Sequence, residues 1–286
     1  MKDLLKKILY KKKSKEIFLI DKNEHIDFVI DAVNDEDYLG IDTEFDWRNT
    51  YFPKLSLLQI DTNNKILLID CIKISDLSFL KEILENKKRL NVFHSVRSDT
   101  TVLFSSLSIS MTNVFDIQAA QQIIEGGEIK NYAAIVKSYL PISLKKTETN
   151  SNWLKRPFTN EQLDYAAKDV EFLVRIYRKQ KKILLKSNLL DKAFKKSQME
   201  ANFGNQKLYI PRLKKLKKYS QLDKEIFMWR EKLAERKNIP PSKIFKGIHI
   251  KSLTKNIKNE SLDRKHLNKI FNNEKEMNNF IKEMKL

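Results

Sequence analysis

The hydrophobic pattern from Ile17 onward is typical of an α/β domain. Short runs rich in leucine and β-branched residues predict strands at residues 17–20, 38–45, 55–61, 65–70 and 89–94. Helical periodicity predicts helices from Asp21, a plausible N-cap, to about residue 33, near 76–87 and over 97–107. The second, third and fourth strands are closely spaced, which favours an antiparallel meander. Strands first and helices later indicate a mixed sheet covered by helices.

After Asp116 the chain is helical almost throughout. Residues 179–218 are rich in lysine and poor in glycine, which predicts a long helix and connector. We therefore expect four segments: a basic N-terminal extension (1–16), an α/β domain (17–180), a basic helical connector (181–218) and a small helical bundle (219–286). The extension is expected to be frayed, with a surface helix as the alternative.

The net charge is concentrated in the last third of the chain. Residues 1–178 contain 26 Lys or Arg and 26 Asp or Glu, whereas residues 179–286 contain 29 basic and 11 acidic side chains. The whole excess of +18 therefore lies in the C-terminal part. Such a surface attracts polyanions and releases their counterions on binding, so a nucleic acid is the expected partner. The alternative is a lysine-rich composition that only decorates a solvated face.

The cysteine content and the length of the apolar runs exclude a disulfide-stabilised protein and a membrane-spanning protein. The single cysteine, Cys71, lies in an apolar run and is expected in the core, and it allows no intrachain disulfide. No apolar run reaches the ~18 residues that a membrane helix needs, and the first residues lack the apolar segment of a signal peptide. We therefore expect a cytoplasmic protein that does not associate with a membrane. The sequence identifies no protein partner.

Three short segments supply candidate carboxylates. Asp42 and Glu44 are two apart on a predicted strand and project from one face, where their mutual repulsion requires a cation. Asp99 comes soon after the fifth predicted strand, and Tyr165 lies four residues before Asp169 on one face of a predicted helix. Each of these signals alone is more often structural than catalytic.

Taken in order, the segments resemble the DEDDy family of 3′ to 5′ exonucleases, and their sequence motifs are close to those of ribonuclease D. The resemblance runs from about Ile17 to Tyr177 and rests on DTEFDWRNTYFPKLSLLQI, HSVRSD and TNSNWLKRPFTNEQLDYAAKDVEFL. It implies a ribonuclease H-like mixed sheet flanked by helices, and two divalent ions, Mg²⁺ or Mn²⁺, as cofactors. The second motif, HSVRSD, departs from the family's pattern at Arg97 and Ser98. This difference affects the expected detail of the substrate channel and leaves the ligand assignment unchanged.

The resemblance also assigns roles to individual residues. The family's metal ligands match Asp42, Glu44, Asp99 and Asp169, with the first bridging both ions, the second and fourth on the ion nearest the attacking water, and the third on the other ion. Tyr165 matches the residue that orients this water. Two ions ~3.5–4 Å apart activate the water and stabilise the leaving 3′ oxygen. Hard oxygen ligands favour Mg²⁺ or Mn²⁺ over zinc.

Residues that would contact the substrate are weaker predictions. The candidates are Tyr51, Phe52, Gln59, His94 and Arg156. The aromatic rings could stack on the terminal nucleotides, Gln59 could hydrogen-bond to them, and Arg156 could hold a phosphate. Packing is an equal alternative for Phe52, as is a structural role for His94. We interpret Trp153 as a packing residue and Asp116 as a helix cap.

The C-terminal part resembles the HRDC domain, a small helical bundle. This match covers roughly residues 219–286 and rests on the word WREKLAERKNIPP and on helical periodicity. Its charge favours contact with RNA, and a packing or partner module is the alternative.

Together these patterns predict a 3′ to 5′ exoribonuclease that releases nucleoside 5′-monophosphates from RNA with a free 3′ end. The expected substrates are tRNA precursors or other stable RNAs. The alternatives are a DNA 3′ to 5′ exonuclease of the proofreading type, and an RNA-binding protein whose catalytic site has decayed.

Overall fold

The computed structural model describes residues 7–8, 15–144 and 151–285. Within these residues the chain forms two compact units, as the sequence predicts. The first contains the chain up to Asp46 and Lys54–Gln206, and the second contains Trp47–Pro53 and the chain from Lys207 onward. Most of the predicted connector (181–218) therefore belongs to the first unit. The predicted domain boundary near residue 180 lies instead after Gln206.

The first unit is built on one mixed sheet, confirming the predicted α/β class. Its strands, within the described residues, are β1 (Lys7–Ile8), β2 (Glu16–Ile20), β3 (Tyr38–Asp46), β4 (Lys54–Asp61), β5 (Lys65–Asp70), β6 (Leu90–Phe93) and β7 (Val114–Asp116). Their order is β1-β2-β5-β4-β3-β6-β7. The antiparallel meander of β3, β4 and β5 is confirmed. The pairs β2/β5, β3/β6 and β6/β7 are parallel.

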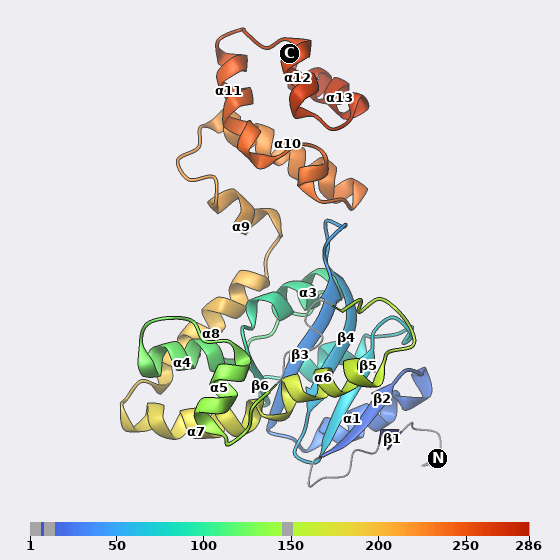
Figure 1. Ribbon diagram of the computed structural model, residues 1–286, viewed down its shortest axis with the longest axis vertical. Coiled ribbons are helices and arrows are strands. Elements are labelled where there is room, and N and C mark those ends of the chain that lie inside the picture. Colours follow the sequence, from blue (N-terminus) through green and yellow to red (C-terminus); the bar gives the residue numbers. More distant parts are fainter. Residues whose placement is uncertain (1–6, 9–14, 145–150, 286) are drawn as a thin grey trace. The chain divides into compact units, whose positions relative to one another are not determined.

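Helices cover both faces of this sheet (Figure 1). One face packs against α1 (Ile26–Asn34), α2 (Phe79–Leu84) and α3 (Arg97–Leu107). The other face packs against α4 (Ile117–Glu125), α5 (Tyr132–Tyr139), α6 (Asn160–Glu171) and α7 (Leu173–Lys186). Alternation along β4 separates the two cores, because Leu57 belongs to the second and Leu58 to the first. The last helix of the unit, α8 (Leu190–Gly204), contacts α3, α4 and β7.

Several predicted elements differ from the structure. The strand β7 was missed because only three residues form it. Lys7–Ile8 pair with β2 as a short strand where a frayed extension was expected, and the rest of residues 1–14 lies outside the described residues. Asp21 does not cap a helix, since a 3₁₀ turn at Asn23–His25 precedes α1. The predicted long helix after residue 179 is broken near Asn188, whose φ of 56° is left-handed.

The second unit is a small all-α bundle, as predicted. Its helices, within the described residues, are α9 (Tyr209–Lys214), α10 (Gln221–Lys237), α11 (Ile250–Lys258), α12 (Arg264–Ile270) and α13 (Glu274–Met284), with 3₁₀ turns at Pro241–Lys243 and Gly247–His249. A capping box between Ser220 and Asp223 starts α10, and Asn238 in the left-handed region ends it. Its core is aromatic, with Phe227, Phe245 and Phe280 almost fully enclosed.

The loop between β3 and β4, Trp47–Pro53, belongs to this second unit. Tyr51 is only 1% exposed and packs in the aromatic core of the bundle. The backbone N–H groups of Tyr51 and Phe52 both donate to the Asn238 side-chain oxygen at 3.1 Å. The Arg212 guanidinium lies over the Tyr51 ring, 4.7 Å from its centroid. The prediction that Tyr51 stacks on a nucleotide is therefore wrong, because its ring is enclosed by protein, and Phe52 is partly buried against the same core.

No helix in the described part of the chain is long and apolar enough to cross a bilayer.

Candidate active site

The site begins on β3, where Asp42 and Glu44 share one face of the strand. Gly40 lies on that face too, two residues earlier. A Cβ at Gly40 would lie 3.0 Å from the Val170 carbonyl oxygen and 3.3 Å from the Leu173 Cβ. The absence of a side chain there lets the junction of α6 and α7 approach β3 closely, so that Asp169 of α6 reaches the two carboxylates.

Three of the four predicted ligands meet directly. Asp42, Glu44 and Asp169 each offer one carboxylate oxygen, and these oxygens all lie within 4.8 Å of one another. The helix that carries Asp169 starts at a capping box formed by Thr159 and Gln162. The Tyr165 hydroxyl donates a hydrogen bond to Asp169, as the four-residue spacing predicts.

Asp99 stands beside this group at the edge of β3. The parallel pairing of β6 with β3 ends at Gly40, so the backbone N–H of Thr43 is free to donate to the Asp99 carboxylate. The Thr43 hydroxyl also donates to it, at 2.6 Å. Because Thr43 lies between Asp42 and Glu44, this bond holds the Asp99 carboxylate beside the other three, and the charge of Asp99 raises the pKa of Asp42.

Asp116 holds the segment that leads into α3. Its carboxylate caps α4 through the Gln118 N–H at 2.8 Å, confirming the predicted cap. It also accepts from the backbone N–H groups of Ser95 at 2.9 Å and Val96 at 3.2 Å. These bonds fix the turn immediately before α3 and therefore the position of Asp99. The second role was not visible in the sequence, because the donors are about twenty residues away.

The four carboxylates destabilise one another's charged forms. Burial, followed by the charges of Asp99, Asp169 and Glu44, raises the pKa of Asp42 well above its ordinary value. Burial and the charges of Asp169 and Asp99 raise the pKa of Glu44 to about 9. Burial also raises the pKa values of Asp99 and Asp169 to about 7, against hydrogen bonds from Thr43 and Tyr165 that lower them. Near neutral pH the cluster therefore holds protons unless cations replace them.

This donor set fits divalent metal ions. Carboxylate oxygens are the ligands that Mg²⁺ and Mn²⁺ prefer, and no thiol or imidazole belongs to the group of three within the described residues. A cation offsets the repulsion that raises the four pKa values. The predicted cofactors, two divalent ions, agree with the arrangement. The carboxylates of Asp42, Glu44 and Asp169, with Asp99 beside them, would hold these ions.

The Arg156 guanidinium, which was predicted to hold a phosphate, is bound to protein groups instead. Its Nε donates to Asp70 at 2.6 Å, and Nη2 donates to Asp70 at 2.8 Å and to the Ser56 hydroxyl at 3.0 Å. Its Nη1 donates to the Trp153 carbonyl oxygen at 2.6 Å. The residue instead fastens the segment before α6 to β4 and β5. Trp153 is 4% exposed and packs beside Tyr165, as expected of a packing residue.

His94 is half-buried at the end of β6 and contacts a tyrosine that the sequence did not single out. Its ring lies 5.5 Å from that of Tyr132, and its Nε2 lies 3.2 Å from the Gln118 amide nitrogen. The Tyr132 hydroxyl donates to the Lys168 carbonyl oxygen at 3.1 Å. Burial, then the charge of Asp169, raises the pKa of Tyr132, so this residue also lies near the carboxylates. No local pattern marks Tyr132, because its neighbours come from other elements.

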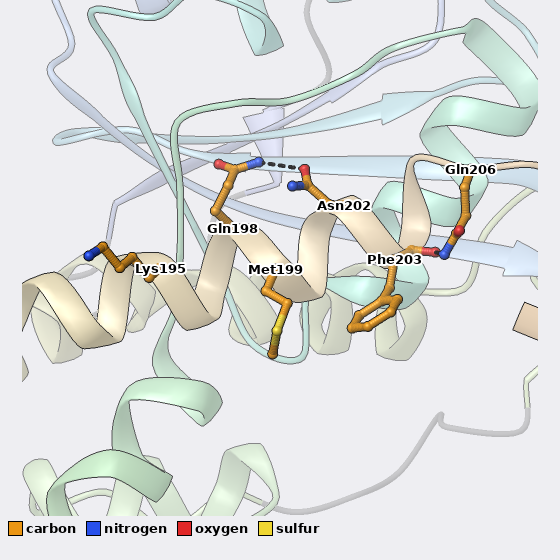
Figure 2. A pocket seen from close by; sticks show the side chains of 6 residues that line it. All are labelled: Lys195, Gln198, Met199, Asn202, Phe203 and Gln206. Atoms are coloured by element: carbon orange, nitrogen blue, oxygen red, sulfur yellow. Dashed lines mark hydrogen bonds between the residues drawn. The ribbon is translucent and has the colours of Figure 1, made fainter.

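The remaining candidate, Gln59, is fully buried on β4 and cannot reach a nucleotide from the surface. A separate hollow of about 410 Å³ lies along α8 (Figure 2). It is lined by Lys195, Gln198, Met199, Asn202, Phe203 and Gln206. None of these is a carboxylate, and none belongs to the acidic site.

Comparison with known proteins agrees with this geometry. The family model described as 3′-5′ exonuclease matches residues 17–185, more than half of the chain. Ribonuclease D of Desulfotalea psychrophila is 31% identical over 242 residues, covering 80% of this chain and 64% of the relative. Ribonuclease D of Haemophilus influenzae is 30% identical over 229 residues, covering 76% and 57%. The chain thus spans less than two thirds of the length of these curated relatives.

Solved structures show the same fold. The crystal structure of Escherichia coli RNase D, described as an exoribonuclease involved in structured RNA processing, matches with a TM-score of 0.74 at 23% identity, covering 81% of this chain and 64% of that one. The catalytic core of RRP6 from Trypanosoma brucei matches with a TM-score of 0.64 at 22% identity, covering 88% and 73%. With the matched family model and four carboxylates gathered at the edge of β3, the chain belongs to the 3′-5′ exonuclease family.

Proposed function

We propose that the protein is a 3′ to 5′ exoribonuclease that hydrolyses RNA one nucleotide at a time and releases nucleoside 5′-monophosphates. The observation that carries the proposal is the convergence of Asp42, Glu44 and Asp169 within 4.8 Å, with Asp99 beside them. The ribonuclease D relatives support RNA as the substrate class. Precursors of tRNA or other stable RNAs with a free 3′ end are the proposed substrates, and the cytoplasm is the proposed location.

The chemistry divides between the metal ions and the protein. Two divalent ions, when bound, supply a water nucleophile at neutral pH and stabilise the leaving 3′ oxygen. Glu44 and Asp169 would hold the ion nearest the attacking water, and Asp99 the other. The Tyr165 hydroxyl, bonded to Asp169, is placed to orient that water without acting as a strong base. Thr43 holds the Asp99 carboxylate in one orientation, which limits the rearrangement needed when a metal binds.

RNA and DNA oligonucleotides of the same sequence distinguish this proposal from a proofreading-type DNA exonuclease. With Mg²⁺ or Mn²⁺ we expect shortening of a 5′-labelled RNA from its 3′ end, with slower turnover of the DNA. Product ladders on denaturing gels measure both rates. Equal or faster cleavage of DNA would favour the DNA exonuclease, and no cleavage of RNA with either metal would favour a decayed, binding-only protein.

We also propose that the C-terminal bundle, which resembles an HRDC domain, contacts the RNA backbone. Residues 207–286 contain 22 Lys or Arg against 9 Asp or Glu. Three of the lysines, Lys251, Lys255 and Lys258, are exposed on α11 at helical spacing, while the opposite side of that helix is buried. This basic stripe offers a row of cations to successive phosphates.

Replacing Lys251, Lys255 and Lys258 by alanine should weaken RNA binding and reduce its salt dependence. The slope of log affinity against log salt should become shallower by about 2, since each single-strand phosphate contact contributes about 0.7. Fluorescence anisotropy with an inactive variant measures the slope. Alanine at Lys81, Lys87 and Lys88, exposed in the first unit, is the matched control because it removes the same charge. Equal slopes for both triple variants would make the bundle a packing or partner module.

A further inference from the structure

Gln59 is a buried amide without a hydrogen-bond partner. Its side chain is 0% exposed, and neither its nitrogen nor its oxygen has a partner. Such a group costs about 1–3 kcal/mol of stability, which a leucine of similar size would avoid. Gln180 is also 0% exposed, but its nitrogen donates to the Ile117 carbonyl oxygen at 2.9 Å and to the Gln121 side-chain oxygen at 3.0 Å. The side-chain nitrogen of Gln180 therefore has hydrogen-bond acceptors, whereas that of Gln59 has none among the described residues.

The sheet register places this amide next to the central carboxylate of the site. Gln59 on β4 pairs directly with Asp42 on β3. Directly opposed residues project from the same face of a sheet with Cβ atoms about 4.5–5.5 Å apart. On its other side Gln59 pairs with Leu68, which offers no polar group. Asp61, two residues along β4, accepts from Lys15 at 2.5 Å through one oxygen, its other oxygen has no partner among the described residues, and it does not lie directly across from Gln59. Asp42 is thus the directly opposed polar side chain.

We propose that Gln59 is a positioning residue for the metal site. Its amide nitrogen would donate to the Asp42 carboxylate when that carboxylate holds a metal ion. Hydrogen bonds to a ligating carboxylate fix its orientation, and their loss typically lowers metal affinity or activity about 10- to 100-fold. The inference rests on the proposed function, since it requires metal at the acidic cluster. It explains why a polar side chain occupies a place that apolar packing would otherwise fill.

The test compares Gln59→Leu with Gln180→Leu in the full chain without RNA. Manganese binding is followed by the loss of the free Mn²⁺ signal in electron paramagnetic resonance, and stability by thermal unfolding in EDTA. For Gln59→Leu we expect about 10- to 100-fold weaker Mn²⁺ binding, with a Tm in EDTA equal to or above that of the wild type. For Gln180→Leu we expect a lower Tm, because two hydrogen bonds are lost, and unchanged Mn²⁺ affinity.

Wild-type Mn²⁺ affinity in Gln59→Leu would overturn the inference and assign Gln59 a packing role. If this variant fails to fold, Gln59→Met, whose unbranched chain follows the shape of glutamine more closely, gives the same readout. A wild-type protein that cleaves RNA with Mn²⁺ while Gln59→Leu binds the metal normally contradicts this inference alone. A wild-type protein that binds no Mn²⁺ contradicts both the inference and the proposed function.

Discussion

Asp42→Asn is expected to lower RNA hydrolysis by at least about 10³-fold, because a metal ion supplies several kcal/mol of transition-state stabilisation and each 1.36 kcal/mol is a factor of ten. One carboxylate oxygen of Asp42 lies within 4.8 Å of oxygens of Glu44 and Asp169, so the neutral amide should impair metal binding. Asp169→Asn should behave similarly. Single-turnover cleavage of a 5′-labelled RNA measures the loss.

The matched control is Asp164→Asn. Asp164 lies on the same helix as Asp169 but forms a surface ion pair with Lys168 four residues later. We expect nearly wild-type cleavage from it, because an exposed pair of this kind contributes little. RNA affinity, measured by anisotropy in EDTA, should be retained in Asp42→Asn and Asp169→Asn. Substantial cleavage by Asp42→Asn would contradict the assignment of the acidic cluster as the catalytic site.

In the absence of metal, the acidic cluster should make the protein less stable as the pH rises. The folded-state pKa values of Asp99 and Asp169 are raised to about 7 and that of Glu44 to about 9. A carboxyl group with a raised pKa contributes its full stability below the unfolded value near pH 4. That contribution is lost as the pH rises through the folded value. The loss should therefore develop between about pH 4 and pH 9.

A comparison with Asp169→Asn isolates this effect from other titrating groups. In EDTA the free energy of unfolding of the wild type, minus that of the variant, should fall by on the order of 2 kcal/mol between pH 5 and pH 8, after allowance for solvent screening. Saturating Mn²⁺ should raise the stability of the wild type at pH 8, because ligands that bind only the folded state stabilise it. Chemical denaturation at each pH measures both. A pH-independent difference, or no gain from Mn²⁺, would contradict the proposed electrostatics.

Those parts of the site that depend on local periodicity could be predicted. The two-residue spacing of Asp42 and Glu44 gives a shared face on any strand, and the four-residue spacing of Tyr165 and Asp169 gives neighbours on any helix. The cap at Asp116 follows from the same local rule, since its first acceptor bonds reach only two and three residues ahead. These features need no knowledge of the rest of the chain.

Partners that are distant in sequence could not be predicted. Arg156 was expected to hold a phosphate, but its carboxylate partner Asp70 lies 86 residues away. Tyr51 comes a few residues after Asp42 and Glu44 and was expected to stack on a terminal nucleotide. Its ring is instead enclosed by residues of the C-terminal bundle. The break near Asn188 depends on a single left-handed residue within an otherwise helix-forming sequence.

The sequence by itself determined the α/β class, the meander of β3 to β5 and the helical C-terminal unit, because each rests on spacing within a few residues. The four carboxylates were predicted from the resemblance of three separated motifs to the exonuclease family. Only the tertiary structure decided that Asp99 binds the unpaired edge of β3 through Thr43, and that Gln59 lies unpaired across from Asp42. Strand register and helix docking set those relations. Both depend on how side chains pack in the two cores of the first unit. Segments from many parts of the chain form these cores, so no single segment determines the register or the docking.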